Sequence, residues 1–163
     1  WAKDPEVTKF LTWAPHESVA DSEAILSEWI PLYENPEHYH WAIALKENPE
    51  NPIGSIVAVR YDRDLNQAHI GYCIGRAWWN RGITSEALGA LIEFFFERAG
   101  LNRVDSRHDP NNPNSGMVME KCGMVCEGLL HQADISNRGI CDTKWYGILA
   151  DDYFSGLKSL ATG

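Results

Sequence analysis

The sequence predicts a mixed α/β fold, with one sheet flanked by helices, in a single domain that covers residues 1–163. Three observations carry this prediction. Near the start of the chain apolar residues recur every three to four positions, which is typical of an amphipathic helix. Short β-branched and aromatic runs separated by turn residues come next, and these indicate strands. The segment Thr84–Ala99 is then apolar around most of its circumference, so we expect a helix buried against the sheet.

The first half of the chain is expected to hold one helix and three strands. The helix is predicted over Ser18–Tyr33, and Pro31 ends or kinks it. The strands should form an antiparallel meander over Trp41–Glu47, Ile53–Arg60 and Ala68–Ile74, with turns at Glu47–Asn51 and Tyr61–Asn66.

The second half begins with the buried helix, which Gly100 ends. The remaining elements are a strand over Arg103–Arg107, a short helix from Asn112 to Gly123, and strands over Met124–Leu130 and Thr143–Leu149. Asn112 is the predicted N-cap of the short helix, because Pro113 follows it at a position that proline favours.

Charge and composition exclude several classes of protein. The chain carries 14 Lys and Arg against 23 Asp and Glu, a formal net charge of −9, so it lacks the basic surface that nucleic-acid binding needs. Charges interrupt its apolar runs within a few residues, which excludes a membrane span. The four cysteines and six histidines lack zinc-site spacing, so we expect no metal and free, reduced thiols in a cytoplasmic protein.

The segment that joins the third strand to the buried helix is a candidate anion site. Arg81 and Gly82 lead directly into the helix, whose first backbone N–H groups lack partners within the helix and can hold phosphate oxygens. Gly82 lets the backbone approach a ligand closely, and Arg81 adds charge. The pattern matches neither the phosphate loop with its lysine nor the three-glycine dinucleotide motif. The alternative is that Gly82 simply permits a tight turn.

Four segments in this order resemble those of a known family. They are Ala68–Tyr72, Trp78–Ala87, Asn112–Ser115 running into Glu120–Met124, and Glu127–Gly128 with Asp142 and Asp152–Tyr153. Across residues 4–154 the chain resembles the GNAT N-acetyltransferase superfamily and, within it, the ribosomal-protein-alanine N-acetyltransferases. The resemblance implies a central, mostly antiparallel sheet in which the fourth strand, Ala68–Tyr72, splays from the fifth at a bulge.

The resemblance also implies a reaction. An acetyl group would pass from acetyl-CoA to a primary amine, of a protein N-terminus or a small molecule, by direct attack in a ternary complex. The backbone of Arg81–Ser85 would hold the pyrophosphate, the pantetheine would lie along the fourth strand, and the N–H of Cys73 or Ile74 would be the oxyanion donor. The residues expected to bind acetyl-CoA are Cys73, Ile74, Trp79, Asn80, Arg81, Gly82, Ile83, Thr84, Ser85, Asn112 and Ser115.

Three positions depart from the family pattern. Trp79 stands where the acetyl-CoA loop would have Gln or Arg, and Thr84 stands where it would have Gly or Ala. Met119 occupies the position of a tyrosine that serves many members as general acid, and a thioether has no proton to give. We therefore expect Ser115 or a water to take that role. The alternative is that Ser115 is an ordinary first-turn serine.

His69 occupies the place where many relatives carry a glutamate that removes the ammonium proton through water. An imidazole titrates near neutral pH, so His69 is the predicted general base, at a strand position expected to face the cleft. The alternative is a strand histidine that is bonded to a neighbour and has no catalytic role. Glu34, Tyr33 and Asp134 are the other candidates for the base.

The start of the chain differs from the family, because the first strand is missing and the chain opens on Trp1 instead of Met. We expect that the chain begins late or is a processed product, which leaves the strand Trp41–Leu45 as an open edge. Six apolar residues gather in this third of the sequence: Trp1, Phe10, Leu11, Trp13, Trp29 and Trp41. They predict a homodimer or another partner contact. The alternative is that they pack the core of a monomer.

Two rival functions stay open. One is a catalytically weak GNAT-like module that binds acyl-CoA without turnover, for which Met119 and Thr84 argue; the other is a nucleotide-binding adaptor, for which the Arg81–Gly82 turn alone argues. If the protein is an enzyme, its acceptor is a protein N-terminal amine, an amino acid, a polyamine or an aminoglycoside.

Overall fold

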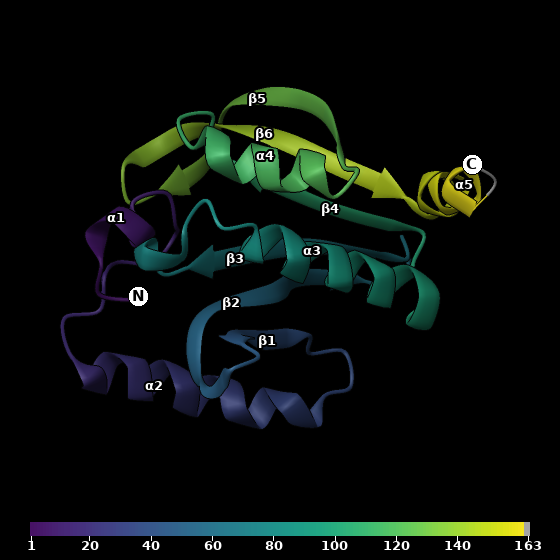
Figure 1. The fold of residues 1–163 in the computed structure, drawn as a ribbon. Coiled ribbons are helices and arrows are strands. Elements are labelled where there is room, and N and C mark those ends of the chain that lie inside the picture. The colour runs from purple at the N-terminus through teal and green to yellow at the C-terminus, as the bar shows by residue number, and fades with distance from the viewer. Residues whose placement is uncertain (162–163) are drawn as a thin grey trace.

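The computed structural model describes residues 1–161, with side chains as far as residue 156, and contains the predicted mixed sheet flanked by helices (Figure 1). The strands are β1 (His40–Leu45), β2 (Asn48–Asp62), β3 (Gln67–Ile74), β4 (Arg103–His108), β5 (Val125–Ser136) and β6 (Gly139–Leu149). The helices are α1 (Pro5–Thr8), α2 (Val19–Trp29), α3 (Ile83–Glu93), α4 (Pro113–Lys121) and α5 (Ala150–Ala161). Shorter turns are η1 (Ile30–Glu34), η2 (Arg76–Trp78) and the π-helical turn η3 (Phe94–Arg98), which continues α3.

The six strands follow the order β1, β2, β3, β4, β6, β5 across the sheet. β1, β2 and β3 form the predicted antiparallel meander, and β6 pairs antiparallel with both β4 and β5. β3 and β4 pair in parallel, because α3 carries the chain back along one face of the sheet between them (Figure 1).

The core lies between the sheet and helices α3 and α4, which lie side by side on one face (Figure 1). α3 presents Leu88, Leu91 and Ile92 to the sheet, and η3 adds Phe95 and Phe96. None of these five side chains is more than 7% exposed. The prediction of a helix buried against the sheet is confirmed.

Alternation along β3 decides which of its side chains reach the core. Ala68 and Ile70 are buried in the core. His69, between them, points to the opposite face of the sheet, where it contacts Asp105 of β4 and the ring of Trp145 of β6. The second face of the sheet therefore carries a buried layer that is partly charged.

β3 and β4 separate halfway along their length. Their parallel pairing ends at Ile70 and Ser106, where Ser106 Oγ donates to the Ile70 carbonyl at 2.7 Å. Beyond this point Gly71–Ile74 still pair with β2 but have no partner on the β4 side in the described sheet. The expected splay is present, but the expected bulge is not in β3, because the nearby register shift lies in β2 between Ala58 and Arg60.

Several boundaries and two helices differ from the sequence prediction. β2 already begins inside the predicted turn at 47–51, because these polar residues pair with the end of β1 through two register shifts. β5 and β6 extend beyond the predicted strands to a turn near Gly139, and the exposure of almost all of β5 removes the apolar alternation that would have shown its length. α1 and α5 were not expected. The assignment of Asp152–Tyr153 to a final strand is wrong, because both residues lie in α5.

The aromatic residues of the amino-terminal third are largely engaged within the chain. Trp41 stacks on Tyr39 and meets Phe94 edge-on, with ring centroids 5.8 and 5.7 Å apart. Trp29 lies 4.3 Å from the ring of His40. Trp41 packs against the core and contacts Phe94 of η3, and the predicted homodimer or partner contact stays a prediction.

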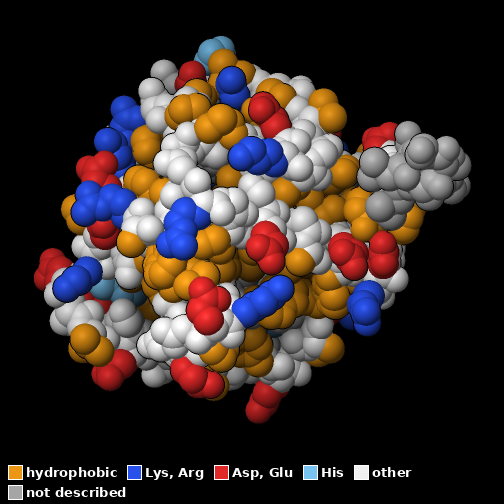
Figure 2. Space-filling model, viewed as in Figure 1, with side chains coloured by type: hydrophobic (Ala, Val, Ile, Leu, Met, Phe, Trp, Pro, Cys, Tyr) orange, Lys and Arg blue, Asp and Glu red, His pale blue; other side chains and the backbone are white. Residues whose placement is uncertain are grey.

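The outer surface is mixed in charge. On the face shown in Figure 2, basic and acidic side chains are interspersed, with hydrophobic side chains between them. Among the described helices, none is long and apolar enough to cross a membrane.

Candidate active site

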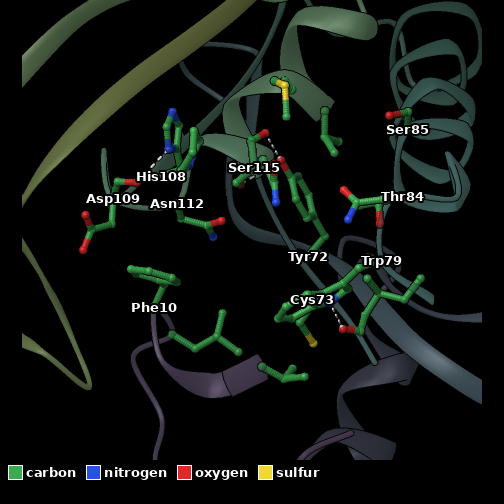
Figure 3. Close-up of a pocket in the computed structure, with 18 of the residues that line it drawn as sticks. Phe10, Tyr72, Cys73, Trp79, Thr84, Ser85, His108, Asp109, Asn112 and Ser115 are labelled. Carbon is green, nitrogen blue, oxygen red and sulfur yellow. Dashed lines mark hydrogen bonds between the residues drawn. The ribbon is translucent and has the colours of Figure 1, made fainter. Parts of the chain in front are cut away.

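A cavity of about 580 Å³ lies where the splayed end of β3 meets the amino ends of α3 and α4 (Figure 3). All eleven residues predicted to bind acetyl-CoA line it. Phe10 and Leu11, which follow α1, and Arg107–Asp109, at the end of β4, line it as well. The structure therefore brings together the predicted donor-binding residues, which three separate segments of the sequence supply.

The loop before α3 has the geometry of an anion site. Gly82 is left-handed, with φ +79° and ψ −8°, and no atom lies within 4 Å of the position that a Cβ would occupy. The N–H groups of Ile83–Ser85 form the first turn of α3, where no carbonyl within the helix can accept from them. The Arg81 guanidinium lies 4.7 Å from the ring of Trp78. Backbone donors, the positive end of the helix dipole and a guanidinium therefore meet at one end of the cavity.

Along β3, the backbone groups of alternate residues face the splay, which is the gap that opens between β3 and β4 beyond Ile70. Trp79 Nε1 donates to the Ile74 carbonyl at 2.9 Å, so this carbonyl faces away from β2, whereas Gly75 N donates to Ile53 on β2. Because the direction of the backbone groups alternates along a strand, the N–H of Ile74 faces the splay and that of Cys73 faces β2. Trp79, at the position of the family's Gln or Arg, thus braces the loop against the end of β3.

The first turn of α4 enters the cavity with Asn112 and Ser115 (Figure 3). Asn112 is the N-cap of α4 and Pro113 takes the first helical position, as predicted, but the Asn112 side chain makes no capping hydrogen bond. The Tyr72 hydroxyl of β3 lies 2.9 Å from the Ser115 carbonyl oxygen and 3.1 Å from Ser115 Oγ. Met119 is fully buried in the core.

His69 is buried, at 6% exposed, and is not among the residues that line the cavity. Nδ1 is bonded to Asp105, and Nε2 lies 3.3 Å from Arg107 Nη1. A guanidinium can only donate, so Nε2 accepts and Nδ1 carries the hydrogen that goes to Asp105. Both ring nitrogens of His69 are therefore hydrogen-bonded to other side chains. The assignment of His69 as general base stays a prediction, and no contact to the cavity supports it.

The groups around His69 form an ion-pair network on the second face of the sheet. Arg107 binds both carboxylate oxygens of Asp134, at 2.5 and 3.1 Å, and also lines the cavity. Burial raises the pKa of Asp105, but its hydrogen bonds to His69 and Arg103 outweigh burial and hold that pKa below its usual value. The network is therefore in its charged form at neutral pH, with Arg107 between His69 and the cavity.

The other predicted bases, Glu34, Tyr33 and Asp134, also lie outside the cavity. Among the described residues, the carboxylates that line it are Glu6 and Asp109.

Asp109 and His108 lie at the end of β4 and were not predicted. The Asp109 side chain is almost fully buried; Oδ1 accepts two hydrogen bonds from Asn111, and Oδ2 lies 3.7 Å from Arg138 Nη1. His108 Nδ1 donates to the Asp109 carbonyl at 2.8 Å, and burial lowers the pKa of His108, so its ring is neutral. Alternation from the buried Val104 could have placed His108 on the core face, next to the cavity.

No group of three or more His, Cys, Asp or Glu able to hold a metal ion occurs in the part of the chain that the structure describes.

The chain is similar to known proteins in both sequence and structure. Residues 1–125 match the family model described as the acetyltransferase (GNAT) domain. The chain is 29% identical over 150 residues to a Bacillus licheniformis protein named "Uncharacterized N-acetyltransferase p20", which covers 92% of this chain and 84% of that protein. It is 30% identical over 103 residues to the ribosomal-protein-serine acetyltransferase of Escherichia coli K12, covering 63% of this chain and 58% of that protein. A crystal structure of a GNAT-family acetyltransferase from Bacillus anthracis superposes with a TM-score of 0.77 at 25% identity, covering 92% of this chain and 85% of that one.

Proposed function

The chain belongs to the GNAT acetyltransferase family, whose members use acetyl-CoA, and from this membership we propose that it acetylates a primary amine by direct attack within a ternary complex. The observation that carries the proposal is the cavity that joins the amino end of α3 to the splayed end of β3. A long thioester that bears phosphates needs an anion site at one end and unpaired backbone groups along its arm. This cavity offers both.

We assign the donor site to backbone more than to side chains. The N–H groups of Arg81–Ser85 would hold the pyrophosphate, and the unpaired backbone of β3 beyond Ile70 would hold the pantetheine. Bound there, acetyl-CoA supplies an activated acyl carbon. The Ile74 N–H, which faces the splay, is the proposed donor to the thioester oxygen in preference to the Cys73 N–H. Trp79 and Thr84 depart from the family pattern without removing these main-chain donors.

The chain's own groups must also handle two protons. An amine attacks only when neutral, so its ammonium has to lose a proton within the cavity. Glu6 and Asp109 are the carboxylates that the cavity offers for this step in place of His69, which Arg107 separates from it. The departing sulfur needs a proton in return, and Ser115, whose hydroxyl is the single one on α4, is the proposed donor.

We propose the N-terminal amine of a protein chain as the acceptor. The support is the relationship to a protein named a ribosomal-protein-serine acetyltransferase, a name that gives a protein as the acceptor. The net charge of −9 agrees with a basic acceptor protein, although net charge does not describe one cleft.

Thiol release from acetyl-CoA tests the function. Wild-type protein should release thiol with peptides that carry a free N-terminal Ser or Ala, and should not do so with the same peptides blocked at the N-terminus. Spermidine and free amino acids, tested beside them, decide whether the acceptor is instead a small amine. Saturable acetyl-CoA binding without release on any amine would identify an acyl-CoA-binding module and contradict the enzyme.

We also propose a homodimer and a cytoplasmic location. β1 pairs on one side only among the described strands, and Trp1 is 39% exposed. The four cysteines are free, which agrees with a reducing compartment. Light scattering at tens of micromolar protein tests the dimer, and the mass of a single chain would exclude it.

A further inference from the structure

The position where many family members carry a proton-donating tyrosine is filled here by Met119, which is fully buried in the core. The need for a donor does not disappear with it. When the acyl carbon–sulfur bond breaks, the electron pair stays on sulfur, and an alkyl thiol ionises only near pH about 8.5. At neutral pH the thiolate is therefore a poor leaving group unless a hydroxyl supplies a proton.

Ser115 carries the single hydroxyl of α4, and it lines the cavity. A lone serine is a weak acid, so the oxygen that it leaves behind must be stabilised as its hydrogen is transferred. Figure 3 shows Tyr72, from β3, pointing at this serine. Its hydroxyl lies within hydrogen-bond distance of both Ser115 oxygens, 2.9 Å from the carbonyl and 3.1 Å from Oγ.

The two distances allow one phenol hydrogen to serve either oxygen. At rest the hydrogen goes to the Ser115 carbonyl, which is the closer acceptor. It can turn to Oγ, 0.2 Å farther from the phenol oxygen, when Ser115 gives up its own hydrogen. Burial raises the pKa of Tyr72, so the phenol keeps its proton and remains a donor at physiological pH.

From this contact we infer that Tyr72 is a positioning residue that aims the Ser115 hydroxyl at the departing sulfur and stabilises its oxygen during the transfer. The inference rests on the proposed acetyl transfer. Sulfur takes the hydrogen of Ser115 Oγ. Ser115 regains one, through cavity water, from the carboxylate of Glu6 or Asp109 that took the proton of the acceptor ammonium. Tyr72 keeps its own proton throughout, so no other reactant is needed.

The test compares Tyr72→Phe, Ser115→Ala, the double variant and Tyr146→Phe. Tyr146 is the matched control because its hydroxyl also bonds to α4, donating to Glu120 Oε1 at 3.1 Å, but from outside the cavity. Tyr72→Phe should lower kcat by about 3- to 10-fold, the effect of one hydrogen bond. Ser115→Ala should lower it by about 100-fold, and the double variant should be no worse than Ser115→Ala within about twofold, because both residues serve one transfer.

The pH profile separates positioning from a merely structural role. Above the thiol pKa the sulfur leaves without a proton, so the kcat deficits of Tyr72→Phe and Ser115→Ala should shrink between pH 7 and 9.5. The acetyl-CoA dissociation constant of Tyr72→Phe should stay within about twofold of wild type, because the hydroxyl that this variant lacks bonds to Ser115. A Tyr72→Phe deficit that is constant with pH, or that Tyr146→Phe shares, overturns the inference, and so does a wild-type kcat. Wild-type protein that releases no thiol overturns the proposed function, and this inference with it.

Discussion

Gly82 and Gly100 provide a matched pair of substitutions that separates backbone strain from ligand binding. Both are left-handed, at φ +79° and φ +68°, and no atom lies within 4 Å of a Cβ at either. Gly82 lines the cavity at the start of α3, whereas Gly100 ends the same helical segment outside it. Replacing each glycine by alanine therefore imposes the same backbone penalty, but only the substitution at Gly82 can contact a bound phosphate.

The magnitudes follow from this geometry. A left-handed conformation costs a residue with a Cβ about 1–2 kcal/mol, and the open space adds no clash. For a chain of this size each kcal/mol lowers Tm by about 2–4 °C, so both variants should melt about 2–8 °C lower than wild type. At Gly82 the added methyl also displaces a phosphate from the Ile83–Ser85 N–H groups. Loss of one such charged hydrogen bond, at about 1.5–3 kcal/mol, weakens acetyl-CoA binding about 10- to 100-fold.

Calorimetric titration of acetyl-CoA and thermal denaturation measure the two effects separately. Gly82→Ala should lose both stability and affinity, whereas Gly100→Ala should lose stability alone. Gly82→Val should remain folded and lose the acetyl-CoA-dependent rise in Tm, because a β-branched residue is disfavoured further in this conformation. If Gly82→Ala or Gly82→Val binds acetyl-CoA with wild-type affinity, the phosphates do not sit on this loop.

Three further predictions concern the loop before α3, Asp105 and His69. Acetyl-CoA should raise Tm more than pantetheine without phosphates, because the loop before α3 binds the pyrophosphate; equal shifts at matched concentration would contradict this. The lowered pKa of Asp105 means that its ionised form stabilises the fold above pH about 3.9 and that this stability disappears as pH falls through the lowered pKa. The unfolding free energies of wild type and Asp105→Asn, from urea denaturation, should therefore converge as the pH falls below about 3.9, and a constant gap would exclude the linkage. His69→Ala should cost about 1–3 kcal/mol of stability, because it leaves Asp105 short of a partner, and should change kcat/KM less than threefold. A loss of about 100-fold that His69→Glu restores would instead establish His69 as the base.

Local sequence patterns were sufficient to predict those elements whose burial follows from their own residues. The helix beginning at Ile83 is apolar on most sides, so it had to be buried, and Gly82 before it had to start a tight turn. The length of β5 could not be predicted in this way, because almost all of its residues are exposed and no alternation of apolar residues marks where the strand ends. α5 was missed although Asp151 and Asp152 lie in its first turn, where acidic residues favour a helix.

Contacts between distant segments could not be read from the sequence. Alternation along β3 shows that His69 and Ile70 face opposite sides, but which side meets the cavity depends on how β4 pairs with β3. That register places Asp105 and Arg107 around His69. The contact between Tyr72 and Ser115 likewise requires α4 to lie over the splayed end of β3, and no periodicity in either segment encodes that placement.

The helix α2 has no buried residue, although it is eleven residues long. It is held by its own capping box at Ser18 and Asp21 and, at its far end, by the contact of Trp29 with His40. Few apolar atoms would be newly exposed if α2 unwound while the sheet stayed intact, so its local opening needs much less free energy than global unfolding. Its amide hydrogens should exchange with solvent deuterium through such openings long before those of α3, and the molecule then has one outer segment that melts and reforms independently of the sheet it lies beside.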